Sequence, residues 1–211
     1  MKIGIIGAGH IGSNAARLFV DAGHQVAISN SRGPETLTDL AEELGDNAMA
    51  VNVDAAVHFG DVILIAIPLG RYKELPWNHF DGKIVIDANN YYPERDGQIK
   101  DLDKGETTSS EMLEDFLPGA RVVKGFNTIW FEHLKTQGNN ELPLDERRAI
   151  FIAGDDSEAK TIVADLIEDI GFAAVDTGFL HEGGELQQPG SAIYNKNLTV
   201  REAAKALSAG A

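Results

Sequence analysis

The stretch "GIIGAGHIGSNAARLFVDAGHQVAISNSR", Gly4 to Arg32, decides the fold. An apolar run at Lys2–Ile6 precedes glycines at 7, 9 and 12. An amphipathic segment at His10–Ala22 and a second apolar run at Gln25–Ser29 follow. The glycines have the spacing G-x-G-x-x-G between a predicted strand and a predicted helix. In that context the pattern indicates a dinucleotide-binding βαβ unit, although a glycine turn without a ligand would show the same letters.

Each glycine has a physical role in such a unit. Gly7 permits the tight turn, Gly9 lets a pyrophosphate approach the backbone, and Gly12 lets the helix pack closely on the strand. The N–H groups that open the helix then face the phosphates. We therefore place His10 and Ile11 in the same cofactor site. The His10 side chain could touch phosphate or lie in solvent.

The end of the second predicted strand reads "SNSR", Ser29, Asn30, Ser31 and Arg32. An acid in this region would accept hydrogen bonds from the ribose 2′-hydroxyl of NAD and would repel the 2′-phosphate of NADP. Hydroxyl groups and a guanidinium can instead donate to that phosphate. The stretch favours NADP(H), while a polar loop that only caps the next helix is the alternative.

Strands and helices alternate along the rest of the chain. Further strands are predicted at 48–51, 61–67, 83–87, 121–124, 149–153 and 173–176, and further helices at 34–44, 54–59, 109–116 and 158–170. This alternation predicts an α/β fold with a doubly wound, mostly parallel, Rossmann-like sheet. We expect residues 1–211 to form a single NADP-binding domain. Residues 177–211 would be a C-terminal extension that could cover the cleft.

Residues at the ends of two predicted strands complete the expected cofactor site. In doubly wound sheets, ligands lie outside the carboxyl ends of the strands. Ala66 and Pro68 in "AIPLGRY" would line the cleft there, with Leu69 beside them. Asn89 and Asn90 in "DANNYYP" could hydrogen-bond a carboxamide or a ribose, or could only satisfy turn backbone.

Composition limits the other classes of function. The 211 residues carry 33 acidic and 18 basic side chains, a formal net charge of −15, and no cysteine. Such an acidic chain is a poor partner for nucleic acid, and cysteine-based chemistry is impossible. The longest apolar run is too short to span a membrane. No basic and apolar leader precedes "KIGIIG", so we expect a cytoplasmic protein without a signal peptide.

Several other side chains give only weak functional signals. The six histidines lack metal-ligand spacing, so no metal site is predicted. His181 alone lies near a segment that could contact a substrate. Trp130 and Phe131 are expected in the core or at an interface. Asp87 is expected to cap a helix or to lie at a solvated edge.

The set "GIIGAGHIG", "SNSRGPETL", "AIPLGRY", "DANNYY" and "VVKGFNTI" resembles the reduced coenzyme F420:NADP oxidoreductase family and its bacterial relatives. The reductase domain of the STEAP metalloreductases belongs to the same wider group. The stretch "VVKGFNTI", Val122 to Ile129, is the most discriminating, although the usual family form has alanine at Gly125. Because no apolar run could span a membrane, we do not expect a complete STEAP-type metalloreductase.

The resemblance implies an NADP(H)-dependent oxidoreductase. Hydride would pass between the nicotinamide and a flavin or deazaflavin ring such as F420, FMN or FAD, with Pro68 and Asn127 near the nicotinamide. The segment His181–Leu198 could contact that acceptor through Gln187, Gln188 or Tyr194, or could be a tail or a dimer contact. A homodimer is one option. A non-catalytic NADP(H) sensor and an imine reductase of the pyrroline-5-carboxylate reductase type are the competing functions.

Overall fold

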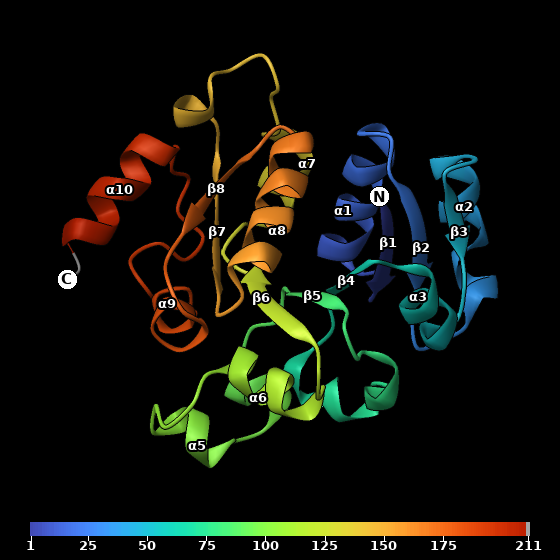
Figure 1. Cartoon of the computed structure of the whole chain (residues 1–211), viewed down its shortest axis with the longest axis horizontal. Helices are drawn as coiled ribbons and strands as arrows, with labels where there is room; N and C mark the ends of the chain where they lie inside the picture. The colour runs from blue at the N-terminus through green and yellow to red at the C-terminus, as the bar shows by residue number, and fades with distance from the viewer. Residues whose placement is uncertain (210–211) are drawn as a thin grey trace.

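The computed structural model describes residues 1–209 and builds them around one eight-stranded sheet. The strands are β1 (Lys2–Ile6), β2 (Gln25–Ser29), β3 (Ala48–Ala50), β4 (Val62–Ile65), β5 (Ile84–Asp87), β6 (Arg121–Gly125), β7 (Ala149–Gly154) and β8 (Ala173–Asp176). Their order in the sheet is β3-β2-β1-β4-β5-β6-β7-β8, so β3 and β8 lie at opposite ends (Figure 1). This confirms the predicted doubly wound sheet.

The direction of the strands changes once. β1 to β6 pair in parallel, whereas β7 pairs antiparallel with β6 and β8 runs parallel to β7. The sheet is therefore mostly parallel, as predicted. Because β8 runs opposite to β1–β6, the chain must turn back after β8 to reach the carboxyl ends of the first six strands.

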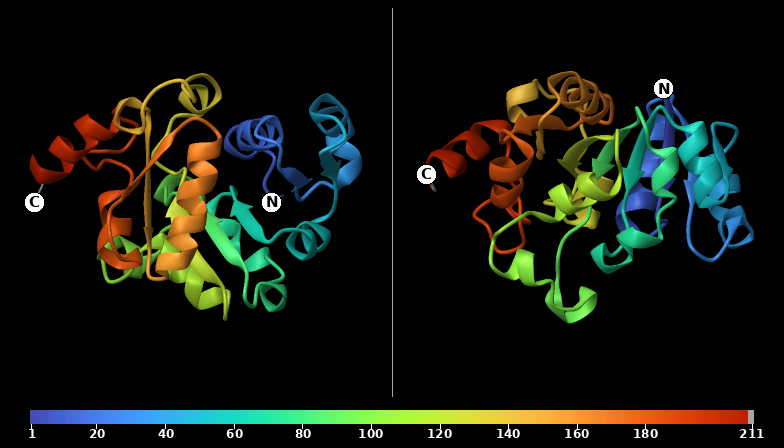
Figure 2. Two further views of the ribbon diagram at one scale, coloured as in Figure 1. Left: turned by 45° about the horizontal axis from the view of Figure 1, so that its top comes forward. Right: turned by 60° about the horizontal axis from the view of Figure 1, so that its bottom comes forward.

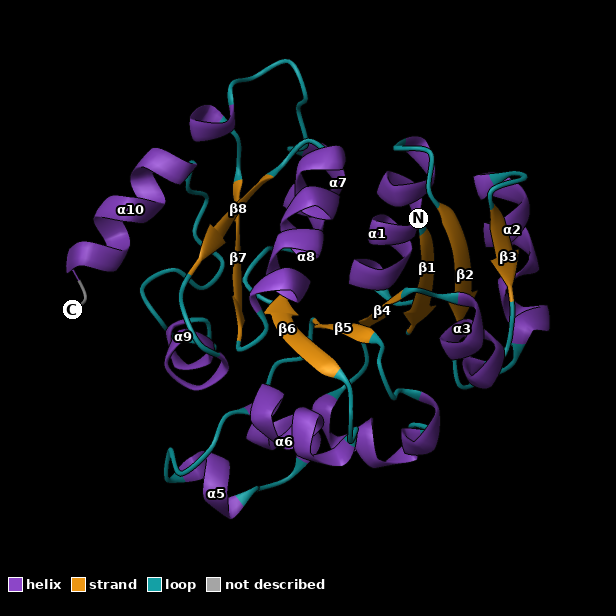
Figure 3. Cartoon of the chain, in the orientation of Figure 1, coloured by secondary structure: helices purple, strands orange, loops and turns teal. Residues whose placement is uncertain are grey.

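Helices cover both faces of this sheet (Figure 3). The α-helices are α1 (His10–Asp21), α2 (Thr38–Leu44), α3 (Val53–Phe59), α4 (Pro93–Asp96), α5 (Lys100–Asp103), α6 (Ser109–Phe116), α7 (Phe131–Thr136), α8 (Ser157–Asp169), α9 (Leu180–Leu186) and α10 (Val200–Ala209). Single 3-10 turns, η1 to η4, lie at Pro34–Leu37, Leu69–Glu74, Trp77–His79 and Leu144–Glu146.

Alternate residues of the central strands enter two separate apolar cores. Val62 and Leu64 of β4 pack with Phe19 of α1, while Ile63 and Ile65 pack on the opposite face with Leu113 of α6. Successive side chains of a strand point to opposite faces. A strand that is apolar at every position therefore needs cover on both sides, which explains the continuous run "DVILIAI".

The C-terminal helix covers the far end of the sheet. Ala203 of α10 packs with Phe151 of β7 and with Ile193. In both views of Figure 2, α10 lies at the margin of the molecule. No separate helix was predicted there. The reason is that α10 has a narrow apolar stripe of alanine and leucine, which buries little surface on its own.

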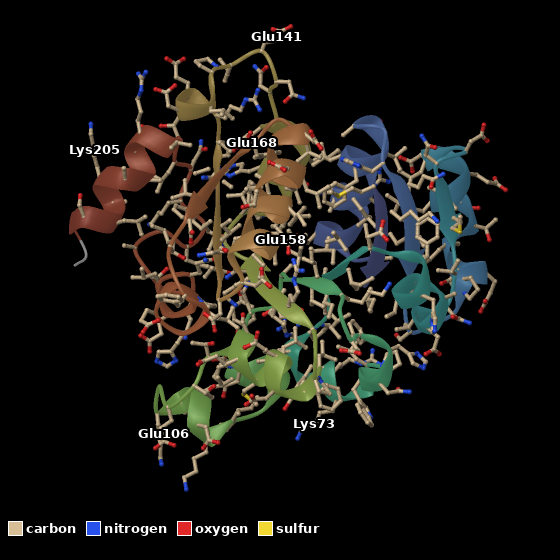
Figure 4. The ribbon with its side chains drawn as sticks, in the orientation of Figure 1. Lys73, Glu106, Glu141, Glu158, Glu168 and Lys205 are labelled. Atoms are coloured by element: carbon tan, nitrogen blue, oxygen red, sulfur yellow. The ribbon has the colours of Figure 1, made fainter. Side chains whose placement is uncertain are left out.

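Charged side chains project outward around the fold. Glu106, Glu141 and Lys205 lie at the periphery, far from the middle of the sheet (Figure 4). Among residues 1–209, no helix has the length and apolar character needed to cross a bilayer. In the same residues, no group of three or more His, Cys, Asp or Glu side chains is placed to hold a metal ion.

Candidate functional site: a cleft across the carboxyl ends of the parallel strands

Two adjoining cavities open at the carboxyl ends of β1, β4, β5 and β6. The glycine-loop cavity has a volume of about 380 Å³ and the aromatic cavity about 360 Å³. Both are lined by Gly9, Ala66, Ile67 and Pro68, so together they form one continuous cleft. From β1 the chain crosses to β2 on one side, whereas β4 and β5 continue on the other. The cleft thus lies where the strand order reverses, the usual ligand position in open α/β sheets.

The three motif glycines differ in what surrounds them. A Cβ on Gly7 would lie 2.2 Å from the Ala66 carbonyl oxygen, and a Cβ on Gly12 would lie 1.8 Å from that of Gly7. A Cβ on Gly9 would meet no atom of the described residues within 4 Å. Gly7 and Gly12 are therefore required by the packing of the protein itself. Gly9 leaves an empty cradle of the kind that a pyrophosphate needs.

The first turn of α1 faces this cradle. Gly9 is the N-cap of α1 and supplies no side chain to the free N–H groups, and the first turn carries no acidic residue. Helix N-termini of this form attract anions through their N–H groups and the helix dipole. His10 and Ile11 line the aromatic cavity, whereas Gly12 is buried against Gly7.

The "SNSR" loop divides between the cleft and the core. Asn30 and Ser31 line the glycine-loop cavity. Ser29 is fully buried, and its hydroxyl donates to the Ile5 carbonyl oxygen at 2.9 Å. Arg32 is exposed outside the lining, and its backbone N–H donates to Asn30 Oδ1 at 2.8 Å. The structure thus places Ser29 in the core and Arg32 at the rim.

A second guanidinium, which the sequence reading missed, lies inside the glycine-loop cavity. Arg71 in the 3-10 turn after β4 donates to Ser31 Oγ at 3.2 Å and to the Glu74 carboxylate at 2.6–3.1 Å. Glu74 lines the same cavity. Arg71 lies three residues after Pro68 in "AIPLGRY". Because Pro68 was expected to line the cleft, this closeness in the sequence was the signal that could have identified Arg71.

Polar side chains after β5 brace the floor of the cleft. Asn89 is buried, and its Oδ1 accepts the Ile67 N–H at 3.1 Å. Its amide nitrogen Nδ2 has no hydrogen-bond partner among residues 1–209. Asn90 lines the aromatic cavity and donates through Nδ2 to the Asn127 carbonyl oxygen at 2.9 Å. Asn90 therefore faces the cavity, while Asn89 holds the loop from behind.

Beneath that floor lies a buried ion pair. Lys124 Nζ is 3.8 Å from Asp87 Oδ2 and donates to the hydroxyls of Ser109 and Ser110 at 3.1 and 3.0 Å. Ser110 in turn donates to Asp87 at 2.6 Å. Burial lowers the pKa of Lys124 despite the opposing effect of Asp87. The expectation that Asp87 would be a solvated or capping residue was wrong, because its strand end is covered by α6.

Aromatic rings line the second cavity. The rings of His10 and Phe131 stack with centroids 4.2 Å apart and an interplanar angle of 15°. Trp130 is 47% exposed and lines the cavity beside them, so it does not lie in the core, and its alternative placement at an interface stays a prediction. Asn14 of α1 donates to the Phe131 carbonyl oxygen at 2.9 Å and fixes this wall to α1. Tyr92, Arg95 and Tyr194 also line this cavity.

The "KGFNTI" turn joins β6 to this wall. Phe126 is buried with a left-handed backbone, at φ 63°, and its ring packs edge-on against Phe19 at 6.2 Å. Non-glycine residues rarely adopt this backbone, which is often found at functional sites. A Cβ on Gly125 would have only ordinary contacts, the nearest at 3.6 Å. Alanine, the usual family residue, would therefore fit there.

The chain after β8 returns to the cleft and is held there through its backbone. Asn127 Nδ2 donates to the Gln187 carbonyl oxygen at 2.8 Å, and the Asn195 N–H donates to the Thr128 carbonyl oxygen at 3.0 Å. Farther along, the Ala149 N–H donates to the Leu198 carbonyl oxygen at 2.9 Å. This return segment, residues 187–198, forms one wall of the aromatic cavity through Tyr194 and Asn195.

Of the other residues expected near an acceptor, none lines this cavity. Gln187 is fully buried, and its Nε2 donates to Thr177 Oγ1 at 2.9 Å. Gln188 borders a small cavity next to Lys124. His181 lies in α9, and its Nδ1 donates to the Glu111 carboxylate at 2.8 Å. The segment His181–Leu198 begins within the helix α9, and only its second part reaches the cleft.

Comparison with known proteins agrees with this geometry. The family model described as "NADP oxidoreductase coenzyme F420-dependent" matches residues 2–91. The solved structure of a hypothetical protein, SMa0349 from Sinorhizobium meliloti, is 35% identical with a TM-score of 0.81, over 94% of this chain and 95% of that one. A candidate F420-dependent NADP reductase from Arthrobacter sp. FB24 shares the fold, with 23% identity and a TM-score of 0.72 over 88% and 89% of the two chains.

A curated relative is a longer protein. Metalloreductase STEAP3 of Rattus norvegicus is 29% identical over 188 residues, which are 88% of this chain and 36% of that protein. The chain thus spans about a third of the length of the metalloreductase. The glycine loop, the strand-end cleft and these matches agree, and residues 2–91 belong to the F420-dependent NADP oxidoreductase family.

Proposed function

We propose that the protein binds NADP(H) along the cleft and transfers hydride between the nicotinamide and a flavin or deazaflavin ring. The observation that carries this proposal is the continuity of the two cavities through Gly9 and Pro68. One cavity has the features of a dinucleotide site. The other is a separate space bounded by aromatic rings. Both volumes fall in the range of small-molecule sites.

The residues present fit the dinucleotide. The open cradle at Gly9 and the first turn of α1 would hold the pyrophosphate. Ser31 and Arg71 would face the 2′-phosphate, with Arg32 approaching from the rim. When bound, reduced nicotinamide supplies the hydride. The protein supplies position and electrostatics, since transfer between two rings needs little acid–base chemistry.

The aromatic cavity suits a planar second ring. His10 and Phe131 are already stacked on one another, and Trp130 and Tyr92 add further flat surface. Stacking holds two rings at the separation of about 3–3.5 Å that hydride transfer requires. Pro68 and Asn127 line this space, so they would flank the nicotinamide where the two ligands meet.

The test is an absorbance assay of NADPH oxidation with F420, FMN, FAD and riboflavin in turn, and with a pyrroline carboxylate as the comparison. We expect turnover of at least one ring acceptor. Activity on the imine alone would indicate an imine reductase. Tight NADPH binding without turnover of any acceptor would indicate a sensor.

A further inference from the structure

Two tyrosine hydroxyls meet at the aromatic cavity. Tyr92 follows β5 and Tyr194 belongs to the return segment, and their hydroxyl oxygens are hydrogen-bonded to each other. Asn90 Nδ2 also donates to the Tyr194 hydroxyl, at 3.5 Å. Both tyrosines line the cavity. Two residues 102 positions apart in the sequence therefore present a pair of hydroxyls to this cavity, which aromatic rings, aliphatic side chains and the side chains of Asn90, Arg95, Asn127 and Asn195 also line.

The two hydroxyls together have one proton that is free to be donated to a ligand. Each hydroxyl has one proton to donate and lone pairs to accept with. One proton is used in the bond between the two hydroxyls. Among the described residues, the other groups that hydrogen-bond the pair are the side-chain amides of Asn90 and Asn195, and both act as donors to Tyr194. The second proton therefore has no acceptor in this set, whichever tyrosine carries it.

The surroundings keep the Tyr194 hydroxyl protonated and place a guanidinium beside the pair, that of Arg95, which is itself paired with the Asp96 carboxylate at 2.8 Å. Burial, together with the Tyr92 hydroxyl, raises the pKa of Tyr194. The Arg95 guanidinium lies 4.9 Å from the centre of the Tyr92 ring and also lines the cavity. Its Nη2 donates to the Asn90 carbonyl oxygen at 2.7 Å, which holds it at this position.

We propose that the Tyr92–Tyr194 pair donates a hydrogen bond to the acceptor ring and stabilises the negative charge that hydride transfer leaves on it. This inference rests on the proposed function. Hydride leaves nicotinamide C4, which becomes the oxidised ring, and forms a C–H or N–H bond at the central ring of the deazaflavin or flavin. The electron pair that the acceptor gains is delocalised over N1 and the C2 carbonyl. The tyrosine proton stays on its own oxygen.

Either tyrosine alone should be sufficient to donate this hydrogen bond. Tyr92→Phe leaves Tyr194 with a free proton, and Tyr194→Phe leaves Tyr92 with one. Each single variant should therefore retain most of the turnover. The double variant Tyr92→Phe/Tyr194→Phe has no such donor, and its kcat should fall about 10- to 100-fold, the effect of losing one hydrogen bond to a developing anion.

The experiment measures kcat with FMN and riboflavin at saturating NADPH, and the Kd of NADPH by fluorescence. Tyr91→Phe is the matched control, because the Tyr91 hydroxyl bonds Asp103 and the Ile99 N–H away from this cavity. We expect the control to keep wild-type turnover and all four variants to keep the NADPH affinity. Thermal unfolding confirms that each variant is folded.

A second readout separates a hydrogen bond to the ring from a structural role. In 2-thioriboflavin the C2 oxygen is replaced by sulfur, a weak acceptor, so the ratio of wild-type to double-variant kcat should shrink toward one. A loss in either single variant as large as that in the double variant, an unchanged ratio with the thio analogue, or full activity of the double variant would overturn the inference. Absence of wild-type turnover with every ring acceptor would instead overturn the proposed function, and this inference with it.

Discussion

The two halves of the cleft are built in opposite ways. The glycine-loop cavity is lined by residues that lie between positions 7 and 75, most of them in the segments directly after β1, β2 and β4. The aromatic cavity takes side chains from residues 10, 92, 130 and 194, which lie on four separate segments. A site made of backbone at strand ends leaves a short, readable motif. A site made by the convergence of distant side chains leaves none.

The largest expected effect concerns the glycine-loop cavity. Gly9→Val should weaken NADPH binding by about 100-fold or more, because the branched side chain fills the space that the pyrophosphate needs. The fold should survive, since a Cβ at Gly9 meets no atom of residues 1–209 within 4 Å. Isothermal titration with NADPH and a thermal melt measure the two effects.

Gly12→Val is the matched control for that variant. Its Cβ would lie 1.8 Å from the Gly7 carbonyl oxygen, so it should destabilise the fold itself. Normal NADPH binding by Gly9→Val would mean that the cofactor does not cross this loop.

The next largest effect should come from the buried ion pair of Lys124 and Asp87 beneath the cleft. Lys124→Met leaves Asp87 buried without its partner and should lower the free energy of unfolding by about 3–5 kcal/mol. The double variant Asp87→Asn/Lys124→Met removes both charges and should regain much of that loss. Urea denaturation of the wild type and the two variants provides the measurement. A double variant no more stable than the single one would show that the pair is not energetically coupled.

Cofactor choice should depend on two guanidinium groups. Arg71→Ala removes the donor beside Ser31 and should weaken NADPH binding by about tenfold, the factor equivalent to one net hydrogen bond, while leaving NADH binding nearly unchanged. Arg32→Ala should act in the same direction from the rim. Titration of each variant with both cofactors tests this. Equal losses for NADPH and NADH would show that neither arginine reads the 2′-phosphate.

The smallest effect is a pH dependence outside the cleft. The hydrogen bond and the charge of Glu111 raise the pKa of His181. Partial burial alone would raise the pKa of Glu111, but hydrogen bonds from His181 and Thr108 hold it below its usual value. The contact therefore stabilises the fold most between the ordinary pKa values of 4.5 and 6.5. It weakens at lower pH as Glu111 protonates, and at higher pH as His181 loses its proton.

His181→Asn should consequently lower the melting temperature more at pH 5.5 than at pH 9. Thermal melts of the wild type and the variant at both values measure the difference. An identical loss at the two pH values would show that the charge of His181 contributes nothing to stability.

Much of the fold could be predicted because its signals are local. The bounds of β1, β2, β8 and α6 agree with the sequence prediction, since each is a short apolar or amphipathic run between turn residues. The reversed direction of β7 could not be foreseen. A strand buried on both faces has the same composition in either direction. The helix α9 was missed because Gly183 and Gly184 disfavour a helix. Gly183 is required by its close approach to Ala153 and Thr177.

The glycine-loop half of the site could be predicted from local motifs, whereas in the aromatic half His10, Ile11 and Asn90 were named from such motifs, and Asn127 and Tyr194 through the family resemblance. Gly7, Gly9, Asn30, Ser31, Ala66 and Pro68 line the glycine-loop cavity. Arg71 was missed because a 3-10 turn, rather than a strand end, carries it into the cleft. The roles of Trp130 and Asp87 depend on tertiary neighbours that no local pattern reveals. The expected homodimer stays a prediction.

The backbone anchoring of the return segment has a consequence for engineering. Asn195 and Leu198 are hydrogen-bonded through a backbone N–H or carbonyl oxygen, whereas Gln187 uses both its carbonyl oxygen and its side-chain amide. Almost any residue supplies the same backbone groups, so side chains between these anchors can vary without releasing the loop, apart from Ile193, which packs in the core with Phe151 and Ala203. Residues 187–198 can therefore be exchanged as a cassette between homologues. Such an exchange would alter which ring is accepted while the dinucleotide half stays untouched.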